Sequence, residues 1–378
     1  MILGSTGSVG TQAADVAEKS GYNVKALSAG KNVSIIENQI RTFRPVAAAM
    51  SDPDAASELK IKVADLDVKI YSGSDGILEM IADTDVDTAV NSIIGVAGLA
   101  PTLAVIEKKI RLALSNKESL VIAGDVVMKR AEENGVEIAP VDSEHCAIDQ
   151  CLRAGKHEEI KKLIVTASGG PFFNKTREEL SAITVEQALA HPTWKMGPKI
   201  TVDSATLMNK GFEVIEASHL FGIPAEKIEV LVHRESVVHS MVEYRDNSVI
   251  AQLSVPDMRH CVQYAIERPM RMEAVIPELD LTTLGTLHFA KPDEDTFIPL
   301  KLARETLMAG GASTAVLHAA NETAIEYFLA GKIGFLKIMD ALCYVWDSMK
   351  FASKYNDLDG IMECDRQARI LAKTFLDK

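Results

Sequence analysis

Two carboxylates and a serine follow one another at Asp142-Ser143-Glu144, directly after the apolar run Val136–Val141. If the chain stays extended there, side chains two residues apart point to one face, so Asp142 and Glu144 converge. Carboxylate oxygens are the ligands that Mg²⁺ and Mn²⁺ prefer, and the segment could therefore hold a divalent cation. An acidic turn that caps the next helix has the same pattern, so the sequence leaves both interpretations open.

A second polar group lies in residues 203–213. In a helix, Asn209 and Glu213 are four residues apart and Lys210 and Glu213 are three apart, so all three lie near one face. With Ser204 at an expected helix start, the hydroxyl, amide and ammonium groups suit a phosphate, and Glu213 could complete a metal site. A surface Lys–Glu pair beside a serine N-cap is the alternative, and this segment alone favours the alternative.

A third group, Asn116-Lys117-Glu118, follows the expected strand Arg111–Leu114. In a dinucleotide-binding fold the end of this strand faces the nicotinamide, where Lys117 could stabilise charge on a reacting oxygen. An ordinary helix start with flanking charges is the alternative.

Among the nine histidines, His191 stands out because its loop also holds a tryptophan and a methionine. His233 and His239 lie on expected strands, and we interpret them as structural.

Three glycines spaced three residues apart lie near the start of the chain. They stand between the apolar residues 1–3 and the amphipathic stretch Thr11–Lys19. A strand, a glycine turn and a helix in this order are typical of dinucleotide-binding folds. The glycines let the backbone approach a pyrophosphate, and the helix N-terminus supplies N–H groups. A plain glycine-rich turn is the alternative. The candidate cofactor-binding residues of this turn are Gly4, Ser5, Thr6, Gly7, Ser8 and Val9.

The second expected strand indicates which nucleotide would bind. NAD enzymes tend to place Asp or Glu at the end of this strand, where the carboxylate holds the ribose hydroxyls. Here the chain continues Gly30-Lys31-Asn32, which could instead meet a 2′-phosphate. The sequence therefore favours NADP over NAD, although a polar loop without a ligand would have the same composition.

The elements that must position these groups change in character along the chain. Apolar runs and helical patterns alternate over residues 1–141, which predicts a Rossmann-like domain with a parallel sheet. Its expected strands after the glycine turn are Tyr22–Leu27, Val46–Met50, Val68–Tyr71, Thr88–Asn91, Arg111–Leu114 and Val136–Val141, with helices at Leu99–Lys109 and Glu118–Asn134.

Residues 142–267 are expected to form a central α+β catalytic domain with an antiparallel sheet. The strands expected there are Leu163–Ala167, Ile228–His233, Val238–Tyr244 and Val249–Val255, with a hairpin turn at Asp246-Asn247. Residues 268–295 are rich in proline and acidic residues and are expected to be a linker. The helical periodicity of residues 296–378 predicts a C-terminal helical bundle.

Composition limits the classes of partner. The 378 residues carry a formal net charge of −13, which argues against nucleic acid because phosphate neutralisation needs a basic surface. A local positive pocket could still bind a small anion. The sequence contains neither an apolar run of the roughly 18 residues that a membrane span needs nor a signal or transit segment. Five cysteines without a Cys-x-x-Cys pair are typical of free thiols in the cytoplasm.

Together these segments resemble the 1-deoxy-D-xylulose 5-phosphate reductoisomerase family over nearly the whole chain. The resemblance implies an N-terminal NADPH domain, a central catalytic domain, a linker and a C-terminal helical domain. It also implies a homodimer. Besides the motifs above, the resemblance rests on Ala167–Phe172, His191–Gly197, Val202–Gly211 and Pro256–Arg259.

The implied reaction belongs to the non-mevalonate route to isoprenoid precursors. A phosphorylated sugar, 1-deoxy-D-xylulose 5-phosphate, is rearranged by retro-aldol and aldol steps. NADPH then reduces the resulting aldehyde to 2-C-methyl-D-erythritol 4-phosphate. One divalent cation, Mg²⁺ or Mn²⁺, is implied in each active site, with Asp142, Glu144 and Glu213 as its ligands.

The resemblance also assigns roles to residues of this chain. Lys117, Glu144 and His191 are the implied catalytic residues, and Trp194 and Met196 match a flap that closes over the substrate. The implied substrate-binding residues are Lys117, Ser143, Glu144, Ser168, His191, Trp194, Ser204, Asn209, Lys210 and Glu213, of which Ser168, Ser204, Asn209 and Lys210 match phosphate-binding positions. The implied cofactor-binding residues beyond the glycine turn are Gly30, Lys31, Asn32, Asn116 and Glu118.

The chain departs from the family pattern at two places. Family members usually carry more residues before the glycine turn than the three that precede Gly4 here, and a weaker first strand is one expectation from this. The stretch His233-Arg234-Glu235-Ser236 replaces a commoner Pro-Gln pair. Another NADP-dependent oxidoreductase, such as a homoserine or semialdehyde dehydrogenase, is the alternative enzyme and would lack the metal residues and the flap. A silent NADPH-binding sensor is a further alternative. We expect a cytoplasmic bacterial protein, and a trimmed plastid protein is the alternative that the sequence leaves open.

Overall fold

The computed structural model describes residues 1–194 and 196–378, and the chain divides into two compact units. The N-terminal unit comprises Met1–Ser119, Val127–Cys146 and Asp257–Pro277. The C-terminal unit comprises Leu120–Val126, Ala147–Pro256 and Glu278–Lys378. The segment expected as a linker, residues 268–295, is thus divided between the two units.

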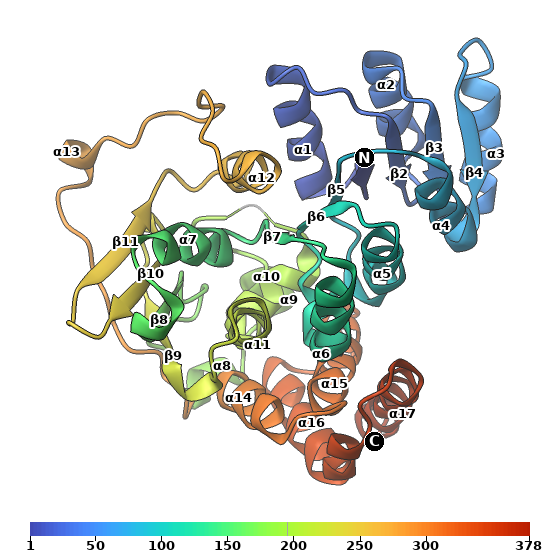
Figure 1. Ribbon diagram of the computed structural model, residues 1–378. Helices are drawn as coiled ribbons and strands as arrows, with labels where there is room; N and C mark the ends of the chain where they lie inside the picture. The colour runs from blue at the N-terminus through green and yellow to red at the C-terminus, as the bar shows by residue number, and fades with distance from the viewer. Residues whose placement is uncertain (195) are drawn as a thin grey trace. The chain divides into compact units, whose positions relative to one another are not determined.

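The N-terminal unit is built on a seven-stranded sheet in the order β4-β3-β2-β1-β5-β6-β7, in which every pair is parallel (Figure 1). This confirms the expected α/β architecture. The strands are β1 Ile2–Leu3, β2 Ala26–Ala29, β3 Ala47–Met50, β4 Lys69–Ser72, β5 Thr88–Asn91, β6 Arg111–Leu114 and β7 Ile138–Pro140. The short β1 lies between β2 and β5, with Ile2 opposite Leu27 and Val90.

Helices connect these strands, as parallel neighbours require. They are α1 Ser8–Lys19, α2 Val33–Phe43, α3 Pro53–Lys62, α4 Gly73–Asp83, α5 Leu99–Glu107 and α6 Lys117–Asn134. One later helix, α12 (Met258–Glu267), also belongs to this unit. Its Val262 and Ala265 are buried in the same core as Ile2, and Arg259 Nη1 lies 3.0 Å from Asp15 Oδ2 on α1.

The C-terminal unit holds a four-stranded sheet in the order β11-β10-β8-β9. The strands are β8 Ile160–Ala167, β9 Ile228–Val232, β10 Val238–Tyr244 and β11 Val249–Leu253. The expectation of an antiparallel sheet is wrong for one pair, because β9 runs parallel to β8. The chain between β8 and β9 passes through helices, and such a crossover returns it in the same direction. The sheet is therefore mixed, while the hairpin of β10 and β11 turns at Asn247 as expected.

Helices complete the C-terminal unit, and they pack around aromatic side chains. Phe335 meets Phe172 and Phe328 edge to face, with ring centroids 5.2 and 5.8 Å apart. The helices are α7 Ser143–Cys151, α8 Arg177–Leu180, α9 Val185–Ala188, α10 Pro198–Ala205, α11 Met208–Phe221, α13 Leu281–Leu284, α14 Pro299–Ala309, α15 Ser313–Leu329, α16 Phe335–Ser348 and α17 Leu358–Leu376. The first turn of α7, up to Cys146, belongs to the N-terminal unit.

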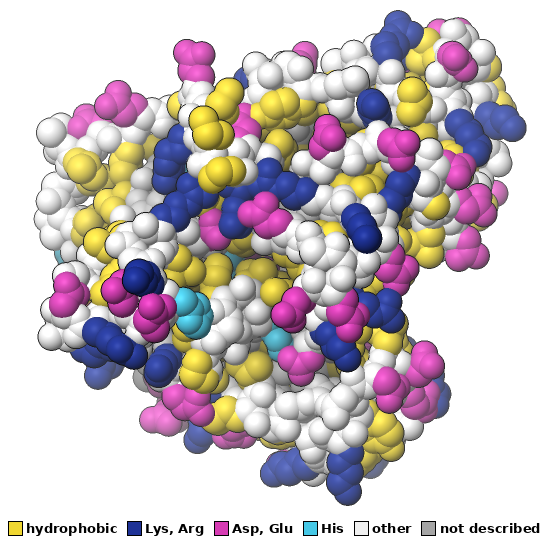
Figure 2. Space-filling model, in the orientation of Figure 1, with side chains coloured by type: hydrophobic (Ala, Val, Ile, Leu, Met, Phe, Trp, Pro, Cys, Tyr) yellow, Lys and Arg dark blue, Asp and Glu magenta, His cyan; other side chains and the backbone are white. Residues whose placement is uncertain are grey.

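Charge is distributed in both signs over the surface in view. Figure 2 shows acidic and basic side chains interspersed on the N-terminal unit, where Arg41 pairs with Glu37 and Asp65. Among the residues that the structure describes, no helix combines the length and the apolar character that a bilayer-crossing segment needs.

Candidate functional site

The glycine turn is shaped by close backbone packing. Gly4 has φ +79°, and a Cβ there would lie 2.8 Å from the carbonyl carbon of Ser92. A Cβ on Gly10 would lie 2.1 Å from the Gly4 oxygen, so helix α1 rests directly on the turn. Helix α1 therefore begins right beside the turn, and N–H groups in the first turn of a helix commonly bind a pyrophosphate.

The remaining residues predicted at the nucleotide differ in exposure. Ser5 is buried and its Oγ donates to Gln39 Oε1 at 2.7 Å, whereas Thr6 and Val9 are half-buried and Ser8 is exposed. We infer that the backbone rather than the Ser5 side chain would face a ligand.

The loop after β2 presents an exposed lysine, Lys31. The Lys31 side chain is 84% exposed and its Nζ lies 3.4 Å from Asp52 Oδ2, at the end of β3. Gly30 is exposed, and Asn32 caps α2 by accepting from the Ile35 N–H at 3.1 Å. Sequence reasoning missed Asp52, although the pair Asp52-Pro53 after an apolar run signals a helix start. Lys31 therefore has the reach and the exposure to meet a phosphate.

Asn116 supports the backbone at the end of β6. Its Oδ1 accepts from the Ser119 N–H at 3.0 Å, and its Nδ2 donates to the carbonyl oxygens of Ile93 and Gly95 at 2.7 and 3.0 Å. Glu118 Oε2 lies 3.0 Å from the same Nδ2. The Asn116 side chain is thus occupied within the protein, and the helix start that it caps sets the position of the next residue, Lys117.

Lys117 and Asp142 form a largely buried ion pair in the N-terminal unit. Lys117 Nζ lies 2.8 Å from Asp142 Oδ2, and the two side chains are 10% and 11% exposed. Burial alone would raise the pKa of the Asp142 carboxyl, but the Lys117 charge and the His145 ring hold that pKa well below its usual range. Asp142 therefore stays ionised at neutral pH, as a cation ligand must.

Asp142 and Glu144 do not lie on an extended segment; of the two interpretations left open by the sequence, the helix-capping one describes Asp142. Helix α7 begins at Ser143, because the Asp142 carbonyl accepts from the Cys146 N–H at 2.8 Å and Asp142 Oδ1 from the Glu144 N–H at 3.2 Å. The Ser143 hydroxyl donates to Glu144 Oε2. Asp142 thus starts the helix, and both carboxylates are half-buried rather than fully solvated.

The group from residues 203–213 lies in the C-terminal unit, with Lys210 and Glu213 buried and Ser204 and Asn209 half-buried. Asn209 and Lys210 both contact Glu213 on α11, as the helical spacing predicted, with Asn209 Nδ2 2.5 Å from Glu213 Oε1. The Lys210 and Glu213 side chains are 5% and 2% exposed, so the surface-pair interpretation is wrong. Ser204 lies in the last turn of α10 and not at a helix start, because Leu207, at φ +61°, separates the two helices.

Ser168 and His191 meet in the same unit. Ser168 follows the last residue of β8, and its Oγ lies 3.0 Å from His191 Nε2. His191 Nδ1 accepts from the N–H groups of Thr193 and Trp194 at 3.1 and 2.9 Å, so the ring proton sits on Nε2 and donates to Ser168. Burial and the charge of Arg234 lower the pKa of His191, which keeps the ring neutral.

The predicted residues thus fall into groups within each unit. Trp194 and Met196 are half-buried, and Lys195 between them lies outside the described residues. The N-terminal unit holds Asn116, Lys117, Glu118, Asp142, Ser143 and Glu144, and the C-terminal unit holds Ser168, His191, Trp194, Ser204, Asn209, Lys210 and Glu213. Sequence reasoning missed Arg234, whose only signal was its departure from the family pattern.

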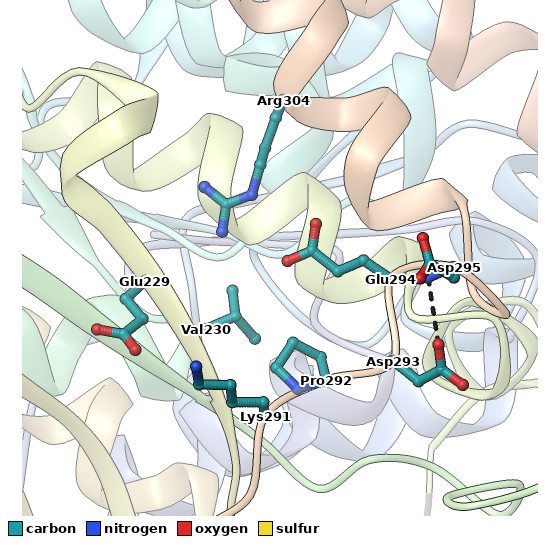
Figure 3. Close-up of a pocket in the computed structure, with 8 residues that line it drawn as sticks. All are labelled: Glu229, Val230, Lys291, Pro292, Asp293, Glu294, Asp295 and Arg304. Carbon is teal, nitrogen blue, oxygen red and sulfur yellow. Dashed lines mark hydrogen bonds between the residues drawn. The ribbon is translucent and has the colours of Figure 1, made fainter.

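A separate pocket of about 440 Å³ lies beside β9 in the C-terminal unit (Figure 3). Arg304, which lines the pocket, binds the protein itself, since its Nη1 donates to the carbonyl oxygens of Ala225 and Ile228 at 2.9 and 2.8 Å. The other charged residues that line it are Glu229, Lys291, Asp293, Glu294 and Asp295. The residues predicted for the site are not among those that line this pocket.

Comparison with known families gives three matches along the chain. The model for 1-deoxy-D-xylulose 5-phosphate reductoisomerase matches residues 1–124. Its C-terminal domain model matches residues 138–221, and a further DXP reductoisomerase C-terminal domain matches residues 253–371. The matches cover both units and most of the chain.

Individual proteins are similar over the full length. A 1-deoxy-D-xylulose 5-phosphate reductoisomerase of Clostridium botulinum (strain Loch Maree) is 47% identical over 372 residues, which is 97% of this chain and 96% of that protein. The 1-deoxy-D-xylulose 5-phosphate reductoisomerase 1 of Bacillus cereus is 45% identical over 379 residues, covering 100% and 98%.

Solved structures share the fold. A crystal structure of DOX-P reductoisomerase in complex with NADPH, fosmidomycin and magnesium superposes with a TM-score of 0.94 at 40% identity, covering 100% of this chain and 97% of that one. The Zymomonas mobilis enzyme in complex with NADPH gives 0.92 at 40% identity, covering 100% and 98%.

Proposed function

The chain belongs to the 1-deoxy-D-xylulose 5-phosphate reductoisomerase family, and from this premise we propose that it rearranges and reduces 1-deoxy-D-xylulose 5-phosphate to 2-C-methyl-D-erythritol 4-phosphate. NADPH and a divalent cation, Mg²⁺ or Mn²⁺, would be required. The observation that carries the proposal is the buried Lys210–Glu213 pair with the half-buried Asn209 beside it, because a buried charged pair is costly unless it serves a ligand or a network.

We assign the cation to Asp142, Glu144 and Glu213. Two observations support the fit: Asp142 keeps its charge beside Lys117, and Glu213 is almost fully buried with an ammonium against it. Anionic oxygens held in place by neighbouring donors suit a hard cation such as Mg²⁺. When bound, the cation would act as a Lewis acid on the ketone and hydroxyl oxygens of the substrate.

The substrate phosphate would bind to Ser168, Ser204, Asn209 and Lys210. Ser168 Oγ already accepts from His191 Nε2 and from the Gly170 N–H at 3.3 Å, so its own proton is left to donate to an anion. Lys210 adds a buried positive charge. A fixed phosphate keeps the fragments of a carbon–carbon cleavage close together, which favours their recombination.

We propose that NADPH lies on the turn from Gly4 to Gly10, with Lys31 at its 2′-phosphate. Support comes from the close contact of α1 with the turn and from the exposed Lys31 ammonium. When bound, the cofactor would supply the hydride. Lys117, held at the start of α6, would stabilise negative charge on a substrate oxygen.

Trp194 and Met196 would cover the bound substrate. The loop that carries them is fixed at one end, since the Trp194 N–H donates to His191 Nδ1 at 2.9 Å. Closure of such a loop excludes water from reactive intermediates. His191 would thus connect the phosphate site to the cover, because the same ring also contacts Ser168.

A homodimer and a cytoplasmic location complete the proposal. Strand β11 is an edge of the C-terminal sheet, and its Val249 and Ile250 side chains are 47% and 38% exposed. An exposed apolar edge strand is the kind of surface that a second copy covers. The five cysteines are not joined in disulfides, as expected in a reducing compartment, and the relatives reported above are bacterial.

The test follows NADPH absorbance with 1-deoxy-D-xylulose 5-phosphate, with and without Mg²⁺ or Mn²⁺, for the wild type and for Asp142→Asn. We expect oxidation that needs the cation and falls at least about a hundredfold in the variant, which loses a charged ligand. A folded wild type that binds NADPH but does not oxidise it with this substrate would refute the proposal and favour a sensor.

A further inference from the structure

Arg234 lies beside the Ser168–His191 pair and is used by none of the roles above. Its Nη1 donates to the carbonyl oxygen of Gly170 at 3.1 Å and lies 3.5 Å from that of Ser168. The guanidinium also sits over the Phe173 ring, 5.4 Å from its centroid. The side chain is therefore held against the loop that carries Ser168, although much of it remains exposed.

The turn that presents Arg234 is itself rigidly built. His233 is fully buried, its ring stacks on Phe289 at 4.7 Å, and its Nε2 accepts from the Val238 N–H at 3.2 Å. Glu235 lies 3.1 Å from His233 Nδ1 and 2.6 Å from His288 Nδ1. Anchors on both sides fix the direction in which Arg234 leaves the turn, so its contact with the loop is a feature of the fold.

The contacts of Ser168 show why the positive charge of Arg234 matters at this place. Because the Ser168 oxygen accepts two N–H groups, its hydroxyl proton remains available to donate to an anion. That arrangement requires a loop that does not shift and a neutral His191 that donates from Nε2. Arg234 holds the loop by binding its carbonyl oxygens. Its positive charge near the ring also lowers the pKa of His191, after the effect of burial, and so favours the neutral ring.

We propose that Arg234 is a positioning residue for the phosphate end of the site: it holds the Ser168–Gly170 loop and adds a positive charge that favours a dianionic phosphate. This inference rests on the proposed function for the identity of the ligand, but the phosphate-binding step can be measured without turnover. It concerns this chain in particular, since Arg234 stands where the family pattern differs.

The experiment compares wild type with Arg234→Ala, Arg234→Lys and Arg234→Gln. Arg245→Ala, at an exposed arginine in the β10–β11 hairpin, is the matched control. For Arg234→Ala we expect KM for the sugar phosphate and the inhibition constant of inorganic phosphate to rise together by roughly three- to tenfold, as for a partly exposed charge. We expect kcat to stay within about twofold, since no reacting atom is touched.

The conservative variants separate charge from shape. Arg234→Lys keeps the charge and should recover part of the phosphate affinity, whereas Arg234→Gln should not. Unchanged KM and phosphate inhibition in Arg234→Ala, or equal recovery by Gln and Lys, would overturn the proposal. Titration with inorganic phosphate, followed by the His191 NMR signals, compares phosphate affinity among the variants without the reaction. A wild type that is inactive on the sugar phosphate would therefore refute only the proposed function and not the role of Arg234.

Discussion

Replacement of Gly10 by alanine separates the packing role of the glycine turn from its binding role. The new Cβ would lie 2.1 Å from the Gly4 oxygen and 2.7 Å from Ser5 Cα, both backbone atoms that cannot rotate away. To reach an ordinary contact of 3.4 Å, helix α1 must move by about 1.3 Å. Overpacking of this kind costs about 3 kcal/mol, and the better helix propensity of alanine returns only about 1 kcal/mol.

Gly7→Ala is the matched control, because its Cβ would lie 3.4 Å from the same oxygen. We expect Gly10→Ala to lower Tm by about 4 °C or more and to weaken NADPH binding at least about tenfold. Gly7→Ala should keep Tm but weaken NADPH binding, since the added methyl group meets the pyrophosphate. Thermal unfolding and calorimetric titration measure both quantities. A Gly10→Ala protein with unchanged Tm and affinity would refute the packing argument, and unchanged affinity in Gly7→Ala would refute the placement of the pyrophosphate.

Three further perturbations test single interactions. Lys117→Met removes the ammonium that lies 2.8 Å from the Asp142 carboxylate. In urea unfolding with a chelator we expect the free energy of unfolding to fall by about 3 kcal/mol, and added Mg²⁺ should restore part of it. Equal stability of variant and wild type would contradict a stabilising ion pair. The lowered pKa of His191 means that the unfolded chain binds its proton more tightly, so its stabilisation is complete above about pH 6.5 and is lost as pH falls through the folded pKa. An NMR titration that gives His191 an ordinary pKa would contradict this. Asn321→Leu removes the hydrogen bond from Nδ2 to buried Asp203 Oδ1 at 2.6 Å and should cost about 2 kcal/mol of unfolding free energy, while a neutral result would show that the bond contributes nothing.

Short buried strands were the most predictable part of the fold. Thr88–Asn91 and Arg111–Leu114 begin and end as expected, because a central parallel strand is buried on both faces and reads as an apolar run. The direction of β9 was not predictable, since a strand's polarity in a sheet depends on a distant crossover and not on its own residues. Local sequence therefore fixes where a strand lies more firmly than how it pairs.

The candidate site was predictable in its residues and less so in its geometry. Helical spacing brought Asn209, Lys210 and Glu213 together, but burial of the Lys–Glu pair comes from tertiary packing that spacing does not contain. At Asp142 the sequence left an extended segment and a helix-capping acidic turn both open, and in the structure the carboxylate accepts the Glu144 N–H and starts a helix. The role of Arg234 was not predicted, because its contact with the Ser168–Gly170 loop joins segments more than 60 residues apart, which no local pattern reveals.

The central claim is that this chain moves a carbon–carbon bond as well as a hydride, with a cation held by Asp142. The most direct measurement follows isotope-labelled 1-deoxy-D-xylulose 5-phosphate by NMR in the presence of NADPH and Mg²⁺. We predict 2-C-methyl-D-erythritol 4-phosphate and oxidised cofactor in equal amounts from the wild type, and neither from Asp142→Asn. Oxidised cofactor together with an unrearranged, simply reduced sugar phosphate would contradict the account.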